Sequence, residues 1–189
     1  MSFLSTLSRL LDLSSSALPQ RRGLDSGWIN PQTLTAIASS IPKEFIEVVT
    51  ICDIAKLNTG DFVFCNQEEL ERKYLSIQLE FADIFELNPQ FYVAEEDGYY
   101  YGLSLVPDSF GRYNVFQIEY ACRVPVCVNI ASSFSSFVVL RLLLLFAENG
   151  SSDEFSDLIS SEISLAGKPA ESDWLQRFKY AKACFEGEY

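Results

Sequence analysis

The spacing of apolar residues changes along the chain from a helical period to a strand period and back. Leu4, Leu7 and Leu11 recur at helical spacing and predict a short amphipathic helix over residues 3–13. Residues 14–27 combine three consecutive serines with a proline and two glycines, a composition typical of an irregular arm. We therefore expect a helix and an arm before the main domain.

Two further helices are predicted between residues 30 and 52. Asn30 can cap the free amides of a helix, and proline is tolerated at the first helical position, which Pro31 occupies. Pro42 then ends the first apolar run and opens a second helix. The inward face of that second helix is formed by Phe45, Val48, Val49 and Cys52.

A hairpin is the best-marked strand feature of the chain. The strand-like runs Phe91–Glu95 and Tyr99–Val106 flank Glu96, Asp97 and Gly98, and Asp-Gly between two such runs predicts a tight turn. Because side chains alternate along a strand, Tyr99 and Tyr101 should face one side of the sheet and Tyr100 the other side.

Other short runs extend this hairpin into a sheet. Residues 61–65 predict a strand, and Asn66 can cap a helix that follows it. Residues 81–85 predict a strand or the approach to one. Residues 113–120 and 124–128 predict two more strands, and together these runs form an antiparallel meander.

The most apolar segment is Phe134–Glu148, whose apolar residues occur on nearly every face of a helix. Ser132 or Ser133 can cap it. It is shorter than the ~20 residues that a membrane span needs, and it contains Arg141, so we expect a buried helix. One or two helical turns should follow, and then a last helix from about residue 172. The apolar stripe of that last helix consists of Trp174, Phe178, Ala181 and Phe185.

These elements predict an α+β fold, in which an antiparallel β-meander packs against helices and extra helices lie at both ends. Residues 1–29 form the N-terminal helix and arm, residues 30–150 the main α+β domain, and residues 151–189 a C-terminal helical extension on the same domain. With 189 residues, 48% of them hydrophobic, the chain can bury a full core.

The net charge narrows the classes of partner that the chain is expected to bind. The chain has 14 basic and 26 acidic residues, a net charge of −12. Binding to nucleic acid or to an anionic membrane needs lysine and arginine, so neither is expected. An acidic balance favours attraction to a basic protein, although solubility alone also accounts for it.

The residue types needed for common catalytic and metal sites are scarce. The chain has no histidine, which excludes Ser-His-Asp and Cys-His arrangements within it, and no glycine-rich phosphate loop. We expect no cofactor and no metal, and a non-catalytic protein. The five cysteines lack zinc-ligand spacing and favour a reducing, cytoplasmic setting; they are Cys52, Cys65, Cys122, Cys127 and Cys184.

The hairpin and the loop after it are the candidate contact surface. The acidic cluster suits a basic surface or a divalent cation, and an aromatic side chain beside it suits a protein partner. A solvated turn and ordinary sheet packing are the alternatives. The predicted partner-binding residues are Glu95, Glu96, Asp97 and Tyr100 of the hairpin, with Asp108, Phe110, Arg112 and Tyr113 of the following loop.

The chain resembles the SUKH superfamily, which includes the yeast Smi/Knr cell-wall-assembly regulator and the bacterial Syd protein. Ile41–Glu47 is similar to the family's Leu-Pro followed by a helix. Gly60–Phe64 with Glu68–Leu70 is similar to its glycine, strand and Glu-Glu-Leu helix. Ile130–Phe137 is similar to its approach to the last family helix. The resemblance covers roughly residues 30–147.

The resemblance implies a protein-binding module. Bacterial members are commonly immunity proteins that neutralise polymorphic toxins, many of them nucleases or deaminases. A charge of −12 suits an inhibitor of a basic nuclease. The expected function is therefore an immunity protein, and the alternatives are a regulator of the Smi/Knr type and an enzyme that uses paired carboxylates.

Overall fold

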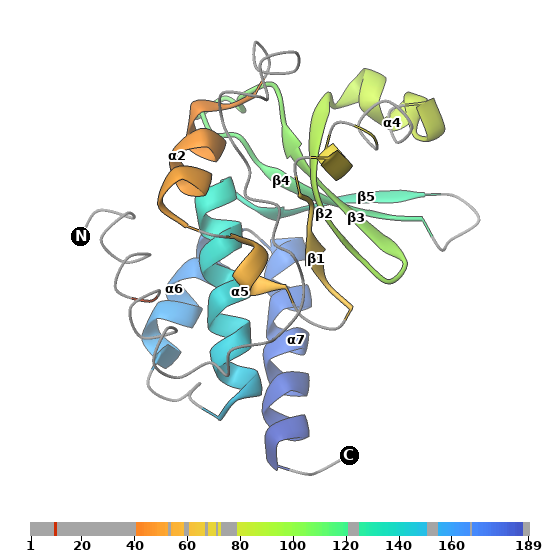
Figure 1. Ribbon diagram of the computed structural model, residues 1–189. Helices are drawn as coiled ribbons and strands as arrows, with labels where there is room; N and C mark the ends of the chain where they lie inside the picture. The colour runs from red at the N-terminus through yellow and green to blue at the C-terminus, as the bar shows by residue number, and fades with distance from the viewer. Residues whose placement is uncertain are drawn as a thin grey trace.

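Figure 1 shows the computed structural model of the chain. The structure describes residues 10, 41–52, 54–58, 61–66, 68–70, 72, 79–120, 125–150, 155–166 and 168–186. Apart from Leu10, the predicted N-terminal helix and arm lie outside these residues, as does the helix start predicted at Asn30.

The sheet is a five-stranded antiparallel meander whose strands neighbour one another in chain order. Gly98, with φ of 82°, lies in the turn between the second and third strands, as the Asp-Gly pair predicted. The strands are β1 (Val63–Phe64), β2 (Gln90–Glu96), β3 (Tyr99–Ser104), β4 (Val115–Glu119) and β5 (Val126–Ala131).

Helices lie on both sides of this sheet, so the α+β class predicted from the sequence is confirmed (Figure 1). We call the side toward α5 the inner face and the opposite side the outer face. The inner side carries α2 (Lys43–Ile51), the 3-10 helix η2 (Ile54–Leu57), α5 (Phe134–Glu148), α6 (Ser156–Ala166) and α7 (Lys168–Glu186), and the outer side carries α4 (Ala82–Leu87).

Helix α5 is the centre of the core. Every residue from Phe134 to Ala147 is buried, because the helix packs against the sheet, α2, α6 and α7 at once. This explains why its apolar residues show no single stripe. The Ser133 hydroxyl oxygen accepts a hydrogen bond from the Ser136 amide and caps the helix, one of the two caps predicted.

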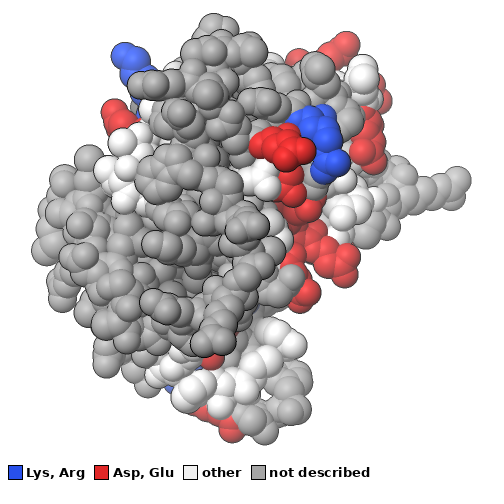
Figure 2. All heavy atoms as spheres, viewed as in Figure 1, with Lys and Arg blue, Asp and Glu red and all other residues white. Residues whose placement is uncertain are grey.

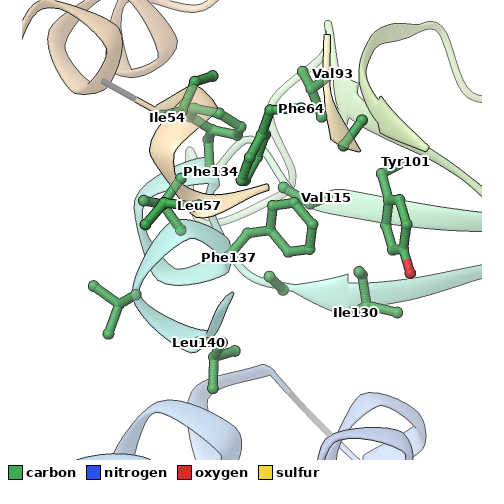
Figure 3. Close-up of a cluster of buried hydrophobic side chains, with 14 of the residues drawn as sticks. Ile54, Leu57, Phe64, Val93, Tyr101, Val115, Ile130, Phe134, Phe137 and Leu140 are labelled. Carbon is green, nitrogen blue, oxygen red and sulfur yellow. The ribbon is translucent and has the colours of Figure 1, made fainter. Parts of the chain in front are cut away.

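An aromatic cluster joins α5 to the sheet (Figure 3). The ring of Phe137 lies 5.3 Å from that of Tyr101 on β3 and 5.9 Å from that of Phe64 on β1, measured between centroids. From the other side, Trp174 of α7 contacts Phe137 and donates its indole N–H to the Ile130 carbonyl at 2.8 Å. The C-terminal helix is therefore part of the same core.

Local sequence rules also placed two smaller elements. Phe45, Val48, Val49 and Cys52 of the α2 segment are buried as predicted. Asn66 accepts a hydrogen bond from the Glu69 amide at 2.9 Å, while its own amide donates to the Glu69 carboxylate at 3.0 Å. This reciprocal pair is a capping box and confirms Asn66 as a cap.

Three predicted elements differ from the structure. Residues 81–85 do not form a strand; Phe81 and Phe85 are both buried one helical turn apart, and α4 begins at Ala82. Helix α6 has 11 residues, or about three turns, rather than one or two. Helix α7 begins at Lys168, and its Phe185 is 58% exposed, outside the predicted buried stripe.

Replacing Phe137 by alanine should destabilise the protein by about 3–5 kcal/mol, because its ring is fully buried among five other aromatic rings. Urea unfolding followed by tryptophan fluorescence measures the loss. Phe110→Ala is the matched control: that ring is 79% exposed, so its removal should change stability by less than about 0.5 kcal/mol. Equal losses in the two variants would contradict this core.

Candidate functional site

A β-bulge in β2 decides which face each acidic residue of the hairpin occupies. The register of β2 against β3 shifts between Tyr92 and Ala94. Beyond the shift, Glu96 pairs with Tyr99 and Glu95 pairs with Tyr100. Because Tyr99 and Tyr101 face inward, Glu96 also faces inward, and Glu95 lies on the outer face with Tyr100.

On the inner face, Glu96 joins three elements through its carboxylate. Its Oε2 accepts a hydrogen bond from Nη1 of Arg177 on α7 at 2.7 Å, and a short one from the Tyr101 hydroxyl. Its Oε1 lies 3.6 Å from Nη1 of Arg141 on α5. We call Glu96, Arg141, Arg177 and Tyr101 the ionic cluster.

Arg141 is the most buried charge of the ionic cluster, with 2% of its surface exposed. Its guanidinium carbon lies 3.6 Å from the centre of the Phe62 ring, so the charge is also stabilised by a cation–π contact. Arg177 is held from the other side by Asp173, whose Oδ2 accepts from Nε at 2.8 Å.

Burial and charge act in opposite directions on the pKa of Glu96. Burial alone would raise it, but the neighbouring charges of Arg177 and Arg141, with the hydrogen bonds from Tyr101 and Arg177, lower the pKa below its ordinary value. Glu96 is therefore ionised at neutral pH, and its negative charge is paired with arginines within the protein.

On the outer face, the hairpin carries a stacked pair of tyrosines. The rings of Tyr100 and Tyr120 lie 4.4 Å apart at an angle of 24°, and Phe81 packs edge-on against Tyr100 at 5.6 Å. The Tyr120 hydroxyl accepts from the Gly98 amide at 3.3 Å, which ties this ring to the hairpin turn. Tyr120 is 37% exposed.

Two carboxylates flank these tyrosines. The Tyr92 hydroxyl donates to Oε2 of Glu95 at 2.8 Å and orients that side chain. Glu95 is the cross-strand neighbour of Tyr100, and Glu80 precedes Phe81, whose ring packs on Tyr100. Burial, then Glu80, Tyr120 and Glu95, raise the pKa of Tyr100. We call Tyr100, Tyr120, Glu80 and Glu95 the tyrosine–carboxylate patch.

The loop after β3 is closed around Asp108. The carboxylate of Asp108 accepts from the amides of Phe110 and Arg112 at 2.8 and 2.9 Å and from the Arg112 guanidinium at 2.9 Å. The Arg112 backbone hydrogen bond and the Arg112 side chain lower the pKa of Asp108 to about 2. Phe110 stands 79% exposed on this loop, with Arg112 over its ring at 4.9 Å.

The structure does not bring all the predicted contact residues together. Asp97 is exposed at the hairpin turn, whereas half-buried Tyr113 and the Asp108 loop lie at the other end of β3. Six residues of strand separate the two ends by roughly 17 Å. The structure thus divides the predicted surface into a hairpin end and a loop end, and turns Glu96 away from both.

Sequence reasoning missed the partners of these residues. The sequence places Arg141 as a charge in an apolar helix, and a buried charge needs a partner, but its position does not say which one. The remaining contact residues come from segments that are distant in the chain, or that become adjacent only when the sheet forms. They are Arg177, Tyr120 and Glu80. No short motif marks them.

Acidic side chains gather on one side of the view in Figure 2, over α4 and the β2–β3 hairpin. The exposed acidic residues of α4, its approach and the hairpin turn are Glu80, Asp83, Glu86 and Asp97. Among the residues that the structure describes, no three His, Cys, Asp or Glu side chains are placed to hold a metal ion. In the same described part of the chain, no helix combines the length and apolarity of a membrane span.

The fold and these surfaces define a small α+β protein with a five-stranded antiparallel meander. No family model matches the chain, and neither a curated protein nor a solved structure is significantly similar to it. The resemblance to the SUKH superfamily therefore stays a prediction.

Replacing Glu96 by glutamine should lower the free energy of unfolding by on the order of 2–3 kcal/mol, because it removes a negative charge that faces the buried guanidinium of Arg141 and pairs with Arg177. Asp97→Asn, one residue away but exposed, should change it by less than about 0.5 kcal/mol. Urea unfolding measures both. A Glu96→Gln variant as stable as Asp97→Asn would contradict the structural role of the ionic cluster.

The contribution of Glu96 to stability should depend on pH. Its pKa is lowered by folding, so this contribution is complete above its ordinary value of 4.5 and is lost as the pH falls through the lowered folded value. The difference in unfolding free energy between wild type and Glu96→Gln should stay constant from pH 7 to pH 5 and shrink in more acidic buffer. A difference that grows on acidification would show that the pKa shift has the opposite sign.

Proposed function

We propose that the chain is a non-catalytic protein-binding module, of the immunity type that the SUKH resemblance implies, which neutralises a basic, nuclease-type toxin by direct binding. The observation that carries the proposal is the Asp108 loop, which holds the ring of Phe110 in solvent. A large aromatic side chain on an ordered loop is what a protein interface buries at its energetic centre.

The loop supports binding because its shape is already set. Asp108 accepts from two backbone amides and from Arg112, and the Asp108 amide donates to the Arg112 carbonyl at 2.8 Å. A loop ordered before association loses less conformational entropy on binding, so more of the contact energy of Phe110 contributes to affinity.

The neighbourhood of the loop and the net charge indicate the kind of partner. The Leu105 amide donates to the Pro89 carbonyl at 2.8 Å, which brings the end of α4 to the same end of the sheet. There Leu87 is 89% and Val106 56% exposed, so apolar area is available beside the loop. A chain of charge −12 should also associate faster with a basic partner.

Quantitative affinity capture tests whether the chain is a protein-binding module. Full-length wild type, Phe110→Ala and Phe185→Ala are immobilised, and the proteins that they retain from cells of the source are compared by isotope-labelled mass spectrometry. A true partner should be reduced at least about tenfold by Phe110→Ala, since an aromatic hot spot contributes about 2 kcal/mol or more. Phe185 is a 58% exposed control on α7 and should retain that partner.

A second step tests the immunity role. The Phe110-dependent partner is expressed alone, with the wild-type protein, and with Phe110→Ala. We expect the partner alone to stop growth, the wild-type protein to restore it, and Phe110→Ala to restore it less. A partner that is harmless by itself would overturn the immunity role, and retention of every partner by Phe110→Ala would overturn the loop as the binding surface.

A further inference from the structure

The tyrosine–carboxylate patch has the chemistry that recognises a guanidinium group. Tyr120 offers the exposed part of an aromatic ring that is already stacked on Tyr100. Glu95, the cross-strand neighbour of Tyr100, is oriented by the Tyr92 hydroxyl, and exposed Glu80 precedes Phe81, whose ring packs on Tyr100. An aromatic face next to carboxylates attracts a planar cation by stacking and by charge together.

We propose that the tyrosine–carboxylate patch binds an arginine side chain of a basic protein partner, with the guanidinium against Tyr120 and paired with Glu95 and Glu80. This inference rests on the proposed function, since it names the group by which a basic partner is held. It concerns the hairpin end of the sheet, whereas the proposed function rests on the loop end.

Charge complementarity identifies the occupant. Asp83 and Glu86 on α4 and Asp97 at the hairpin turn are exposed, and together with the net charge of −12 they favour a cation over an anion as the occupant. The electrostatics around Tyr100 agree, because Glu80 and Glu95 raise the pKa of its hydroxyl; they disfavour further negative charge there and favour a cation.

The patch is also rigid, which a stacking site needs. Both the backbone and the side chain of Tyr120 are hydrogen-bonded to Gly98. Its amide donates to the Gly98 carbonyl at 3.0 Å, and its hydroxyl accepts from the Gly98 amide. Tyr100 is held between Tyr120 and Phe81. The ring that meets the guanidinium therefore keeps its place when the site is empty.

The probe is a ten-residue glycine–serine peptide with three arginines, titrated into the full-length protein by calorimetry at low salt. The matched peptide carries citrulline, which has nearly the shape of arginine without its charge. We expect saturable binding of the arginine peptide, little or none of the citrulline peptide, and weaker binding as salt is added. Amide NMR shifts should concentrate at Gly98, Tyr100 and Tyr120.

Variants separate stacking from charge. Tyr120→Leu should weaken arginine-peptide binding by about three- to tenfold, whereas Tyr120→Phe, which keeps the ring, should bind nearly as wild type. Glu95→Gln should weaken it to a similar extent. Asp157→Asn removes the same charge from an exposed position on α6 and should leave binding unchanged.

Equal binding of the arginine and citrulline peptides would overturn the inference. So would arginine binding that Tyr120→Leu and Glu95→Gln leave unaltered, or that Asp157→Asn weakens as much as Glu95→Gln. Failure here is distinguishable from failure of the proposed function: a Phe110-dependent partner retained by a protein that ignores the arginine peptide would leave the binding module standing and remove only the arginine site.

Discussion

The contact between Glu96 and two arginines is the constraint on which the arrangement of the molecule depends. Arg141 lies in the most apolar helix of the chain, and a charge buried there is costly unless a carboxylate reaches it. Glu96 does so from β2, and Arg177 completes the cluster from α7. One carboxylate therefore links the hairpin, the central helix and the C-terminal helix.

The same constraint gives the two faces of the hairpin different surroundings. The bulge between Tyr92 and Ala94 turns Glu96 inward, and it leaves Glu95 on the outer face within reach of the Tyr92 hydroxyl. Adjacent glutamates thus have different surroundings: one is enclosed by arginines, and the other flanks stacked tyrosines. Replacing Glu95, Glu96 and Asp97 together would therefore lower stability through Glu96, so it would not isolate an effect on the proposed binding surface.

Much of the fold followed from local rules. The Asp-Gly turn, the Asn66 and Ser133 caps and the alternation of β3 depend on residues within a few positions of each other, and the structure has all of them. Residues 81–85, predicted as a strand or the approach to one, form no strand, because a five-residue stretch with four apolar residues fits either period. Burial of Phe81 and Phe85, four positions apart, is compatible with a helix, and Phe81 packs on Tyr100 of the outer face.

By itself, the sequence determined the fold class, the meander, the buried helix and the candidate residues, because periodicity, caps and turns act over short distances. Only the tertiary structure decided which of those residues share a surface. A one-residue bulge reverses every side chain beyond it, so the composition of the hairpin could not show that Glu96 pairs with Arg141 and Arg177. Nor could it show that Tyr100 meets Tyr120, which depends on strand pairing across the folded sheet.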